Sequence, residues 1–129
     1  MLEKRIKILL VDDHEVVLRS IRALVGREPD MEVVATAGNG REAIKLAEQQ
    51  TPDVIVMDVS MPVLDGIRTA GEMKRQGIPA EIIMLSMHYN SALVQQARRN
   101  GASGYIVKQE ANSELIPAIR AAHEGTLSL

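Results

Sequence analysis

The chain has 129 residues, of which 46% are hydrophobic and 25% charged, and its formal net charge is −2. This length suits a single domain, and the composition is that of an ordinary globular protein. Cysteine is absent, which excludes disulfides and thiolate metal sites. Trp and Phe are absent too, and basic residues are not in excess, so this domain itself is not expected to bind DNA.

The first apolar segment, Ile6 to Val11, is too short for the core of a signal peptide. The acidic pair Asp12 and Asp13 follows it directly and argues against membrane insertion. We therefore expect a cytoplasmic protein that does not act at a membrane.

Short apolar runs alternate with segments of helical periodicity along the whole chain. Strands are predicted over residues 6–12, 31–37, 54–57, 81–86 and 104–108. Helices are predicted over residues 15–27, 41–50, 66–76, 91–100 and 113–123. Gly and Pro residues mark most of the connections between them. Either Asp12 or Asp13 is expected to cap the first helix.

Five strands that alternate with five helices predict an α/β fold, a doubly wound parallel sheet with helices on both faces. The expected strand order is 2-1-3-4-5, the flavodoxin-like order. This order puts the switch point, where ligands bind in such sheets, between the first and third strands.

Polar residues stand at the carboxyl ends of four predicted strands. Asp12 and Asp13 end the first strand, Asp58 the third, Ser86 the fourth and Lys108 the fifth. Each has an ordinary structural interpretation: a helix cap, a strand-end hydroxyl or a solvated charge. Because all five fall at one edge of one sheet, we interpret them as a functional site.

Three neighbouring carboxylates repel one another unless a cation joins them. At about 4 Å and an effective dielectric near 20, each pair of like charges costs about 4 kcal/mol. Oxygen ligands of this kind suit Mg²⁺. A hydroxyl and an ammonium bind phosphoryl oxygens, and a carboxylate can act as the nucleophile, so the set predicts phosphoryl chemistry.

Several segments carry a family resemblance. They are Leu10–His14 (LVDDH), Pro52–Pro62 (PDVIVMDVSMP) with Asp65-Gly66, Leu85-Ser86, and Gly101–Lys108 (GASGYIVK). In these segments the chain resembles the receiver domain of two-component response regulators, over essentially its full length.

The resemblance implies that Asp58 accepts a phosphoryl group from a histidine kinase. It also implies that Mg²⁺ is bound directly by Asp13 and Asp58, through water by Asp12, and by the backbone carbonyl of Ser60. Such a domain is not a conventional enzyme, because it catalyses only its own phosphoryl transfer and autodephosphorylation.

The same resemblance assigns the remaining roles. Lys108 would hold one phosphoryl oxygen, and Ser86 would turn inward to another. Tyr105 would be the rotameric switch that links Ser86 to the face made by the fourth helix, fifth strand and fifth helix. A half-buried strand aromatic is the ordinary interpretation of Tyr105, and both can hold together.

Finer features resemble the NarL/FixJ type, whose receivers precede a LuxR-type helix-turn-helix. They are Val11–His14, Leu85–His88 and Gly101–Tyr105. We expect residues 1–129 to be the receiver and 124–129 to begin a linker. DNA would be bound only through a C-terminal domain outside this chain, with homodimerisation on phosphorylation. The alternative is a stand-alone receiver that acts through protein–protein interaction.

Two other classes compete with this interpretation. A haloacid-dehalogenase-type phosphatase also uses an aspartyl nucleophile and Mg²⁺, but it requires a second acid two residues later, where this chain has Ser60. A degenerate receiver that works without phosphorylation would lack one of the five site residues, and none is lost.

The sequence departs from many relatives at Gln109, where they have proline, and at Val63, where they have glycine. A cis bond costs about 2.5–4 kcal/mol before glutamine but only about 0.5–1 kcal/mol before proline. We therefore expect a trans Lys108–Gln109 bond, with the ammonium still reaching Asp58. His88 is expected at the surface, and His14 and His123 are assigned no role.

Overall fold

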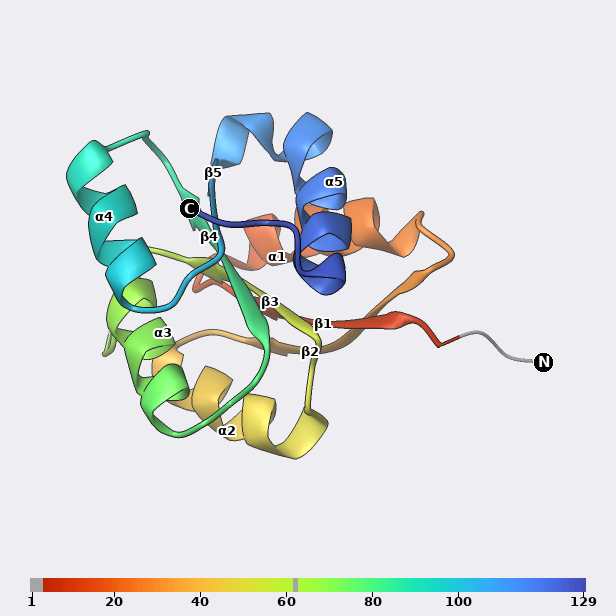
Figure 1. The fold of residues 1–129 in the computed structure, drawn as a ribbon. Coiled ribbons are helices and arrows are strands. Elements are labelled where there is room, and N and C mark those ends of the chain that lie inside the picture. The colour runs from red at the N-terminus through yellow and green to blue at the C-terminus, as the bar shows by residue number, and fades with distance from the viewer. Residues whose placement is uncertain (1–3, 62) are drawn as a thin grey trace.

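The computed structural model describes residues 4–61 and 63–129, and it confirms the α/β fold. Five parallel strands form one sheet in the predicted order, β2-β1-β3-β4-β5 (Figure 1). The strands are β1 (Ile6–Val11), β2 (Met31–Ala37), β3 (Val54–Asp58), β4 (Glu81–Ser86) and β5 (Gly104–Val107).

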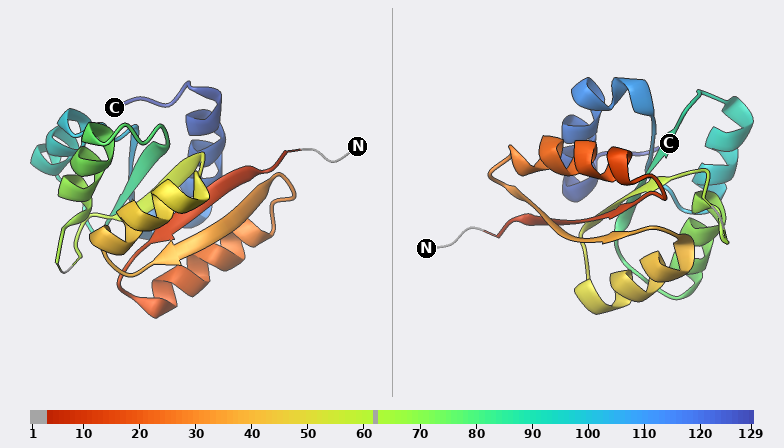
Figure 2. Two further views of the ribbon diagram at one scale, coloured as in Figure 1. Left: turned by 90° about the horizontal axis from the view of Figure 1, so that it is seen from below. Right: turned by 180° about the vertical axis from the view of Figure 1, so that it is seen from behind.

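Helices cover both faces of the sheet. They are α1 (Glu15–Gly26), α2 (Gly40–Gln50), α3 (Gly66–Arg75), α4 (Ser91–Arg99) and α5 (Ala111–Glu124), with the 3-10 turn η1 (Lys108–Glu110) before α5. Helices α1 and α5 pack on one face, and α2, α3 and α4 pack on the other (Figure 2). Among the described residues, no helix is long and apolar enough to cross a membrane.

Strand β3 shows why the central strands are continuously apolar. Ile55 and Met57 belong to the core under α2, α3 and α4, whereas Val54 and Val56 belong to the core under α1 and α5. None of the four is more than 1% exposed. Because side chains alternate along a strand, both faces of β3 must be apolar, and its last residue, Asp58, is held on a rigid support.

The start of α1 differs from the prediction, because neither Asp12 nor Asp13 caps it. The N-cap residue is His14, whose side chain makes no capping hydrogen bond. Asp12 Oδ1 instead accepts the backbone N–H of His14 at 2.9 Å, while Asp12 Oδ2 lies 3.1 Å from Lys108 Nζ. The ion pair at the strand ends thus holds the carboxylate away from the helix.

The connection from β5 to α5 also differs. The strand ends at Val107 instead of Lys108, and α5 begins at Ala111 instead of Ser113, because η1 runs directly into the helix. The Lys108–Gln109 peptide bond is trans, as expected. Pro62, part of the predicted loop after β3, lies outside the described residues.

Candidate functional site

The predicted carboxylates lie at adjacent strand ends. Val11 pairs with Met57 in the sheet, so Asp12 and Asp58, the next residue in each chain segment, emerge side by side. Both are buried, at 2% exposure, whereas Asp13 is more open to solvent. The sheet register thus brings together the acids that the sequence separates.

Gly66 lets the start of α3 lie against this strand end. A Cβ at Gly66 would collide with the backbone carbonyl of Asp58, and the Gly66 N–H donates to Val59 O at 2.9 Å. The preceding residue, Asp65, caps α3 by accepting the Arg68 N–H at 2.9 Å. The Asp-Gly pair therefore fixes the loop that follows Asp58.

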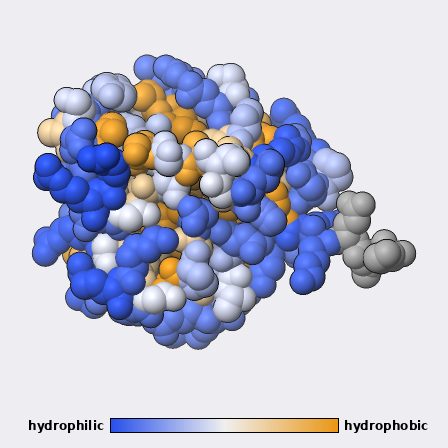
Figure 3. Space-filling model, viewed as in Figure 1, coloured by the Kyte–Doolittle hydropathy of each residue, from blue (hydrophilic) through white to orange (hydrophobic). Residues whose placement is uncertain are grey.

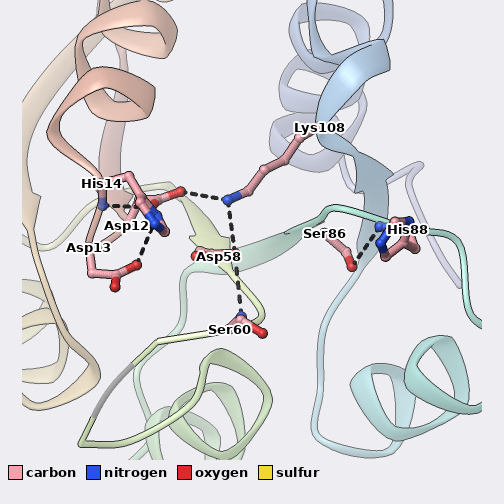
Figure 4. Close-up of polar contacts among 8 residues, drawn as sticks. All are labelled: Asp12, Asp13, His14, Asp58, Ser60, Ser86, His88 and Lys108. Carbon is pink, nitrogen blue, oxygen red and sulfur yellow. Dashed lines mark hydrogen bonds and ion pairs between the residues drawn. The ribbon is translucent and has the colours of Figure 1, made fainter.

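Lys108 directly follows β5, two strands away from β3 in the sheet, and its side chain reaches back to the acids. Its Nζ lies 3.1 Å from Asp12 Oδ2 and 3.2 Å from Asp58 Oδ1, and its side chain is only 16% exposed (Figure 4). The predicted contact of the ammonium with Asp58 is confirmed. The long lysine stem spans the distance although η1, and not the strand, carries the residue.

Burial and charge oppose each other in this cluster. Burial raises the pKa of Asp58 above 3.8, the nearby Asp12 charge raises it further, and Lys108 only partly counteracts them. Burial acts to lower the pKa of Lys108, but the hydrogen bond and charge of Asp12, together with Asp58, outweigh it and raise that pKa. One ammonium therefore does not neutralise the acids, and a further cation would be favoured there.

Two buried carboxylate oxygens also lack hydrogen-bond donors. Asp58 Oδ2 has no partner among the described residues, and Asp12 Oδ2 meets Lys108 without a well-directed hydrogen bond. A buried polar atom without a partner costs about 1–3 kcal/mol. Asp58 Oδ2 in particular would gain from a ligand that supplies positive charge.

Two further groups contact the acids, a ring nitrogen and a backbone N–H, and the sequence predicts neither contact. His14 Nδ1 lies 3.0 Å from Asp12 Oδ1 and 3.1 Å from Asp13 Oδ1. The backbone N–H of Ser60 lies 3.3 Å from Asp58 Oδ1. Ligand atoms of the three acids and His14 lie within 4.8 Å of one another, so they could hold a metal ion.

Ser86 lies across a cleft of about 560 Å³ that opens over Asp58. It is 7% exposed at the end of β4, and its Oγ accepts the backbone N–H of His88 at 3.4 Å. The cleft is also lined by Ser60, Lys108 and His88. It leaves room beside Asp58 for a group of phosphoryl size.

Tyr105, in β5, does not line the cleft, and it packs against the core under α2, α3 and α4. Its hydroxyl donates to the backbone carbonyl of His88 at 2.9 Å, and its ring meets Tyr89 edge-on, with centroids 6.3 Å apart. The link from Ser86 to Tyr105 thus runs through the backbone of His88. The His88 side chain is exposed, as expected.

Comparison with known proteins gives a consistent match. The family model described as the response regulator receiver domain matches residues 8–120. The transcriptional regulatory protein DegU of Brevibacillus brevis is 32% identical over 95% of this chain and 52% of its own length. The nitrate/nitrite response regulator protein NarL of Escherichia coli K12 is 33% identical over 95% of this chain and 56% of its own length. The chain therefore spans about half the length of these curated relatives.

Solved structures match over nearly the whole chain. The signal receiver domain of the putative response regulator NarL from Mycobacterium tuberculosis superposes with a TM-score of 0.92 at 26% identity, covering 95% of this chain and 99% of that one. A LuxR-family two-component response regulator from Aurantimonas sp. SI85-9A1 has the same TM-score at 36% identity, covering 98% and 90%.

Proposed function

The chain belongs to the response regulator receiver domain family, and from this membership we propose that Asp58 accepts a phosphoryl group from a histidine kinase. The observation that carries the proposal is Asp58, a buried carboxylate that lines an open cleft and has one oxygen, Oδ2, without a hydrogen-bond donor among the described residues. A carboxylate oxygen of Asp58 attacks phosphorus, the O–P bond forms as the P–N bond of phosphohistidine breaks, and the kinase imidazole leaves with the electron pair.

Mg²⁺ fits the residues at this edge, because three carboxylates lie close together and two of their buried oxygens accept no hydrogen bond among the described residues. We assign Asp13 and Asp58 as direct ligands, Asp12 as a ligand mostly through water, and the backbone carbonyl of Ser60 as a further ligand. When bound, the ion neutralises charge that develops on the phosphoryl oxygens. The same site would support hydrolysis of the acyl phosphate, the autodephosphorylation of the domain.

Lys108 and Ser86 are proposed to bind phosphoryl oxygens. Phosphorylation turns one negative charge into about two, and the new oxygens compete for the Lys108 ammonium and the Ser86 hydroxyl. If Ser86 turns inward, its contact with the His88 N–H breaks, and the His88 carbonyl that holds the Tyr105 hydroxyl is disturbed. Tyr105 would then move inward and change the face made by α4, β5 and α5.

For the whole protein we propose a transcription regulator of the NarL/FixJ type. DegU, which is named a transcriptional regulatory protein, and the response regulator NarL are both nearly twice as long as this chain, which supports a LuxR-type DNA-binding domain after a linker that begins at residues 124–129. A sensor histidine kinase would be the phosphodonor, phosphorylation would promote a homodimer, and the protein would act in the cytoplasm. This domain is the receiver of a signalling protein and not a conventional enzyme.

Acetyl phosphate with Mg²⁺ tests the acceptor. We expect intact mass spectrometry to show the addition of one phosphoryl group to the chain, and Asp58→Asn to abolish it. Asp53→Asn is the matched control, because Asp53 lies at the opposite end of β3 and accepts the Lys7 N–H. Labelling that survives Asp58→Asn would show that another residue is the acceptor.

A further inference from the structure

His14 extends the carboxylate cluster with a nitrogen atom. Its Nδ1 lies 3.0 Å from Asp12 Oδ1 and 3.1 Å from Asp13 Oδ1, and the ring folds back over the acidic pair (Figure 4). It directly follows Asp13 and sits at the N-cap of α1, yet it makes no capping bond. The ring is therefore directed at the acids and not at the helix.

The 3.1 Å between Nδ1 and Oδ1 of Asp13, a proposed direct ligand, matches the separation of neighbouring ligands of one metal ion. In an octahedral site with metal–ligand distances of about 2.1 Å, adjacent ligand atoms lie about 3.0 Å apart. In the metal-free protein the same spacing allows one Nδ1–H to be shared between two carboxylates. A metal ion would instead be bound by the lone pair of Nδ1, in the tautomer of the neutral ring that carries its proton on Nε2.

The chemistry of the ligand atoms then determines which metal ion binds more tightly. Mg²⁺ prefers oxygen ligands and gains little from imidazole, whereas imidazole favours later first-row divalent ions, with affinity rising from Mn²⁺ through Co²⁺ to Ni²⁺. Asp58 Oδ2 has no partner among the described residues and belongs to a side chain only 2% exposed, which is independent evidence that this pocket accommodates a further cation.

We propose that His14 is a direct metal ligand through Nδ1 and makes this site selective for a first-row transition ion, of the Mn²⁺, Co²⁺ or Ni²⁺ class, over Mg²⁺. The inference rests on the proposed function, because it concerns the same metal site. It adds a nitrogen donor to the oxygen ligands assigned there.

His14→Asn is the most informative variant. Asparagine is among the best N-cap residues, so the start of α1 is preserved while the ring nitrogen is removed. His88→Asn is the matched control, since His88 is an exposed histidine at the same cleft that makes no contact with the acids. Asp13→Asn removes a proposed oxygen ligand and reports whether a metal binds at this site at all.

Two readouts separate the outcomes. Pulsed electron paramagnetic resonance of the Mn²⁺-loaded protein should show ¹⁴N coupling from a bound imidazole, retained in His88→Asn and lost in His14→Asn. Calorimetric titration with each ion alone should show the affinity for Ni²⁺ falling at least about tenfold more than that for Mg²⁺ in His14→Asn. Mn²⁺ that binds in an Asp13-dependent manner without ¹⁴N coupling would overturn this inference and leave the proposed function intact. If no divalent ion binds, both fail.

Discussion

Asp58 combines a reactive position with an unfavourable charge. Burial and the neighbouring Asp12 raise its pKa above the ordinary value of 3.8, so its ionised form costs folding free energy at neutral pH. Below that ordinary value Asp58 is protonated in both the folded and the unfolded chain, and the cost disappears. We therefore expect Asp58→Asn, in the presence of a chelator, to raise the urea midpoint at pH 7, with a gain that shrinks as the pH falls toward 4.

Asp30 supplies a control of opposite sign. The hydrogen bond from Arg120 holds the pKa of Asp30 below its usual value, although burial opposes the shift. Its ionised form therefore stabilises the fold above pH 3.8, and this contribution is lost as the pH falls through the lowered pKa. Asp30→Asn should lower the midpoint at pH 7. A midpoint that falls in Asp58→Asn at pH 7 would mean that the Lys108 contact outweighs the repulsion.

The sequence predicts which residues lie close together better than it predicts the orientations of their side chains. Asp12, Asp58, Ser86 and Lys108 were assigned to one sheet edge because parallel strands align their carboxyl ends, and that placement follows from topology alone. The inward fold of His14 depends on side-chain torsions that no periodicity encodes. Val63 is similar: its φ of 72° is a left-handed conformation that a β-branched residue rarely adopts.

The sequence predicts the starts of helices accurately where a capping residue precedes them. Asn39, Asp65 and Asn90 each accept a backbone N–H in the first turn of the following helix, and α2, α3 and α4 begin within one residue of the predicted positions. Helix α5 has no such signal, because Glu110 makes no capping bond and η1 merges with the helix. Helix α1 also lacks a side-chain cap and still begins at the predicted Glu15, so the error at the start of α5 reflects the merging of η1 with the helix.

Helix α5 also contains Pro117, at an exposed position in its interior. Proline has no N–H, so the carbonyl of Ser113 four residues earlier has no helical donor. We expect Pro117→Ala to raise the free energy of unfolding by about 2 kcal/mol, once the greater freedom of the unfolded chain is deducted. Asn112→Ala, at another exposed position in α5, should gain only a few tenths of a kcal/mol. Equal gains in urea denaturation would mean that general helix propensity, and not the missing N–H, is responsible.

At the scale of the whole molecule, the sheet separates two cores, and the segment after α5 contacts both of them at the β5 edge. The segment after α5 passes over this edge strand, with Leu127 packed on the core of α1 and α5 and Leu129 on that of α2, α3 and α4. Figure 3 shows apolar surface gathered between α4 and α5, over β5 and this segment. An edge strand covered in this way is less available for pairing with another chain.

Substitution of Leu127 tests whether the segment after α5 packs over β5. Leu127→Ala should lower the free energy of unfolding by about 1–2 kcal/mol, below the value for a fully buried leucine because Leu127 is only partly buried. Ser128→Ala, at the exposed residue between the two leucines, should change it by less than about 0.5 kcal/mol.

Gly104 gives a sharper test, since a Cβ there would lie 2.9 Å from Leu127 Cδ2. In a double-mutant cycle by urea denaturation, Gly104→Ala should cost less in the Leu127→Ala background than in the parent chain. Additive costs would show that the segment does not rest on β5 in solution.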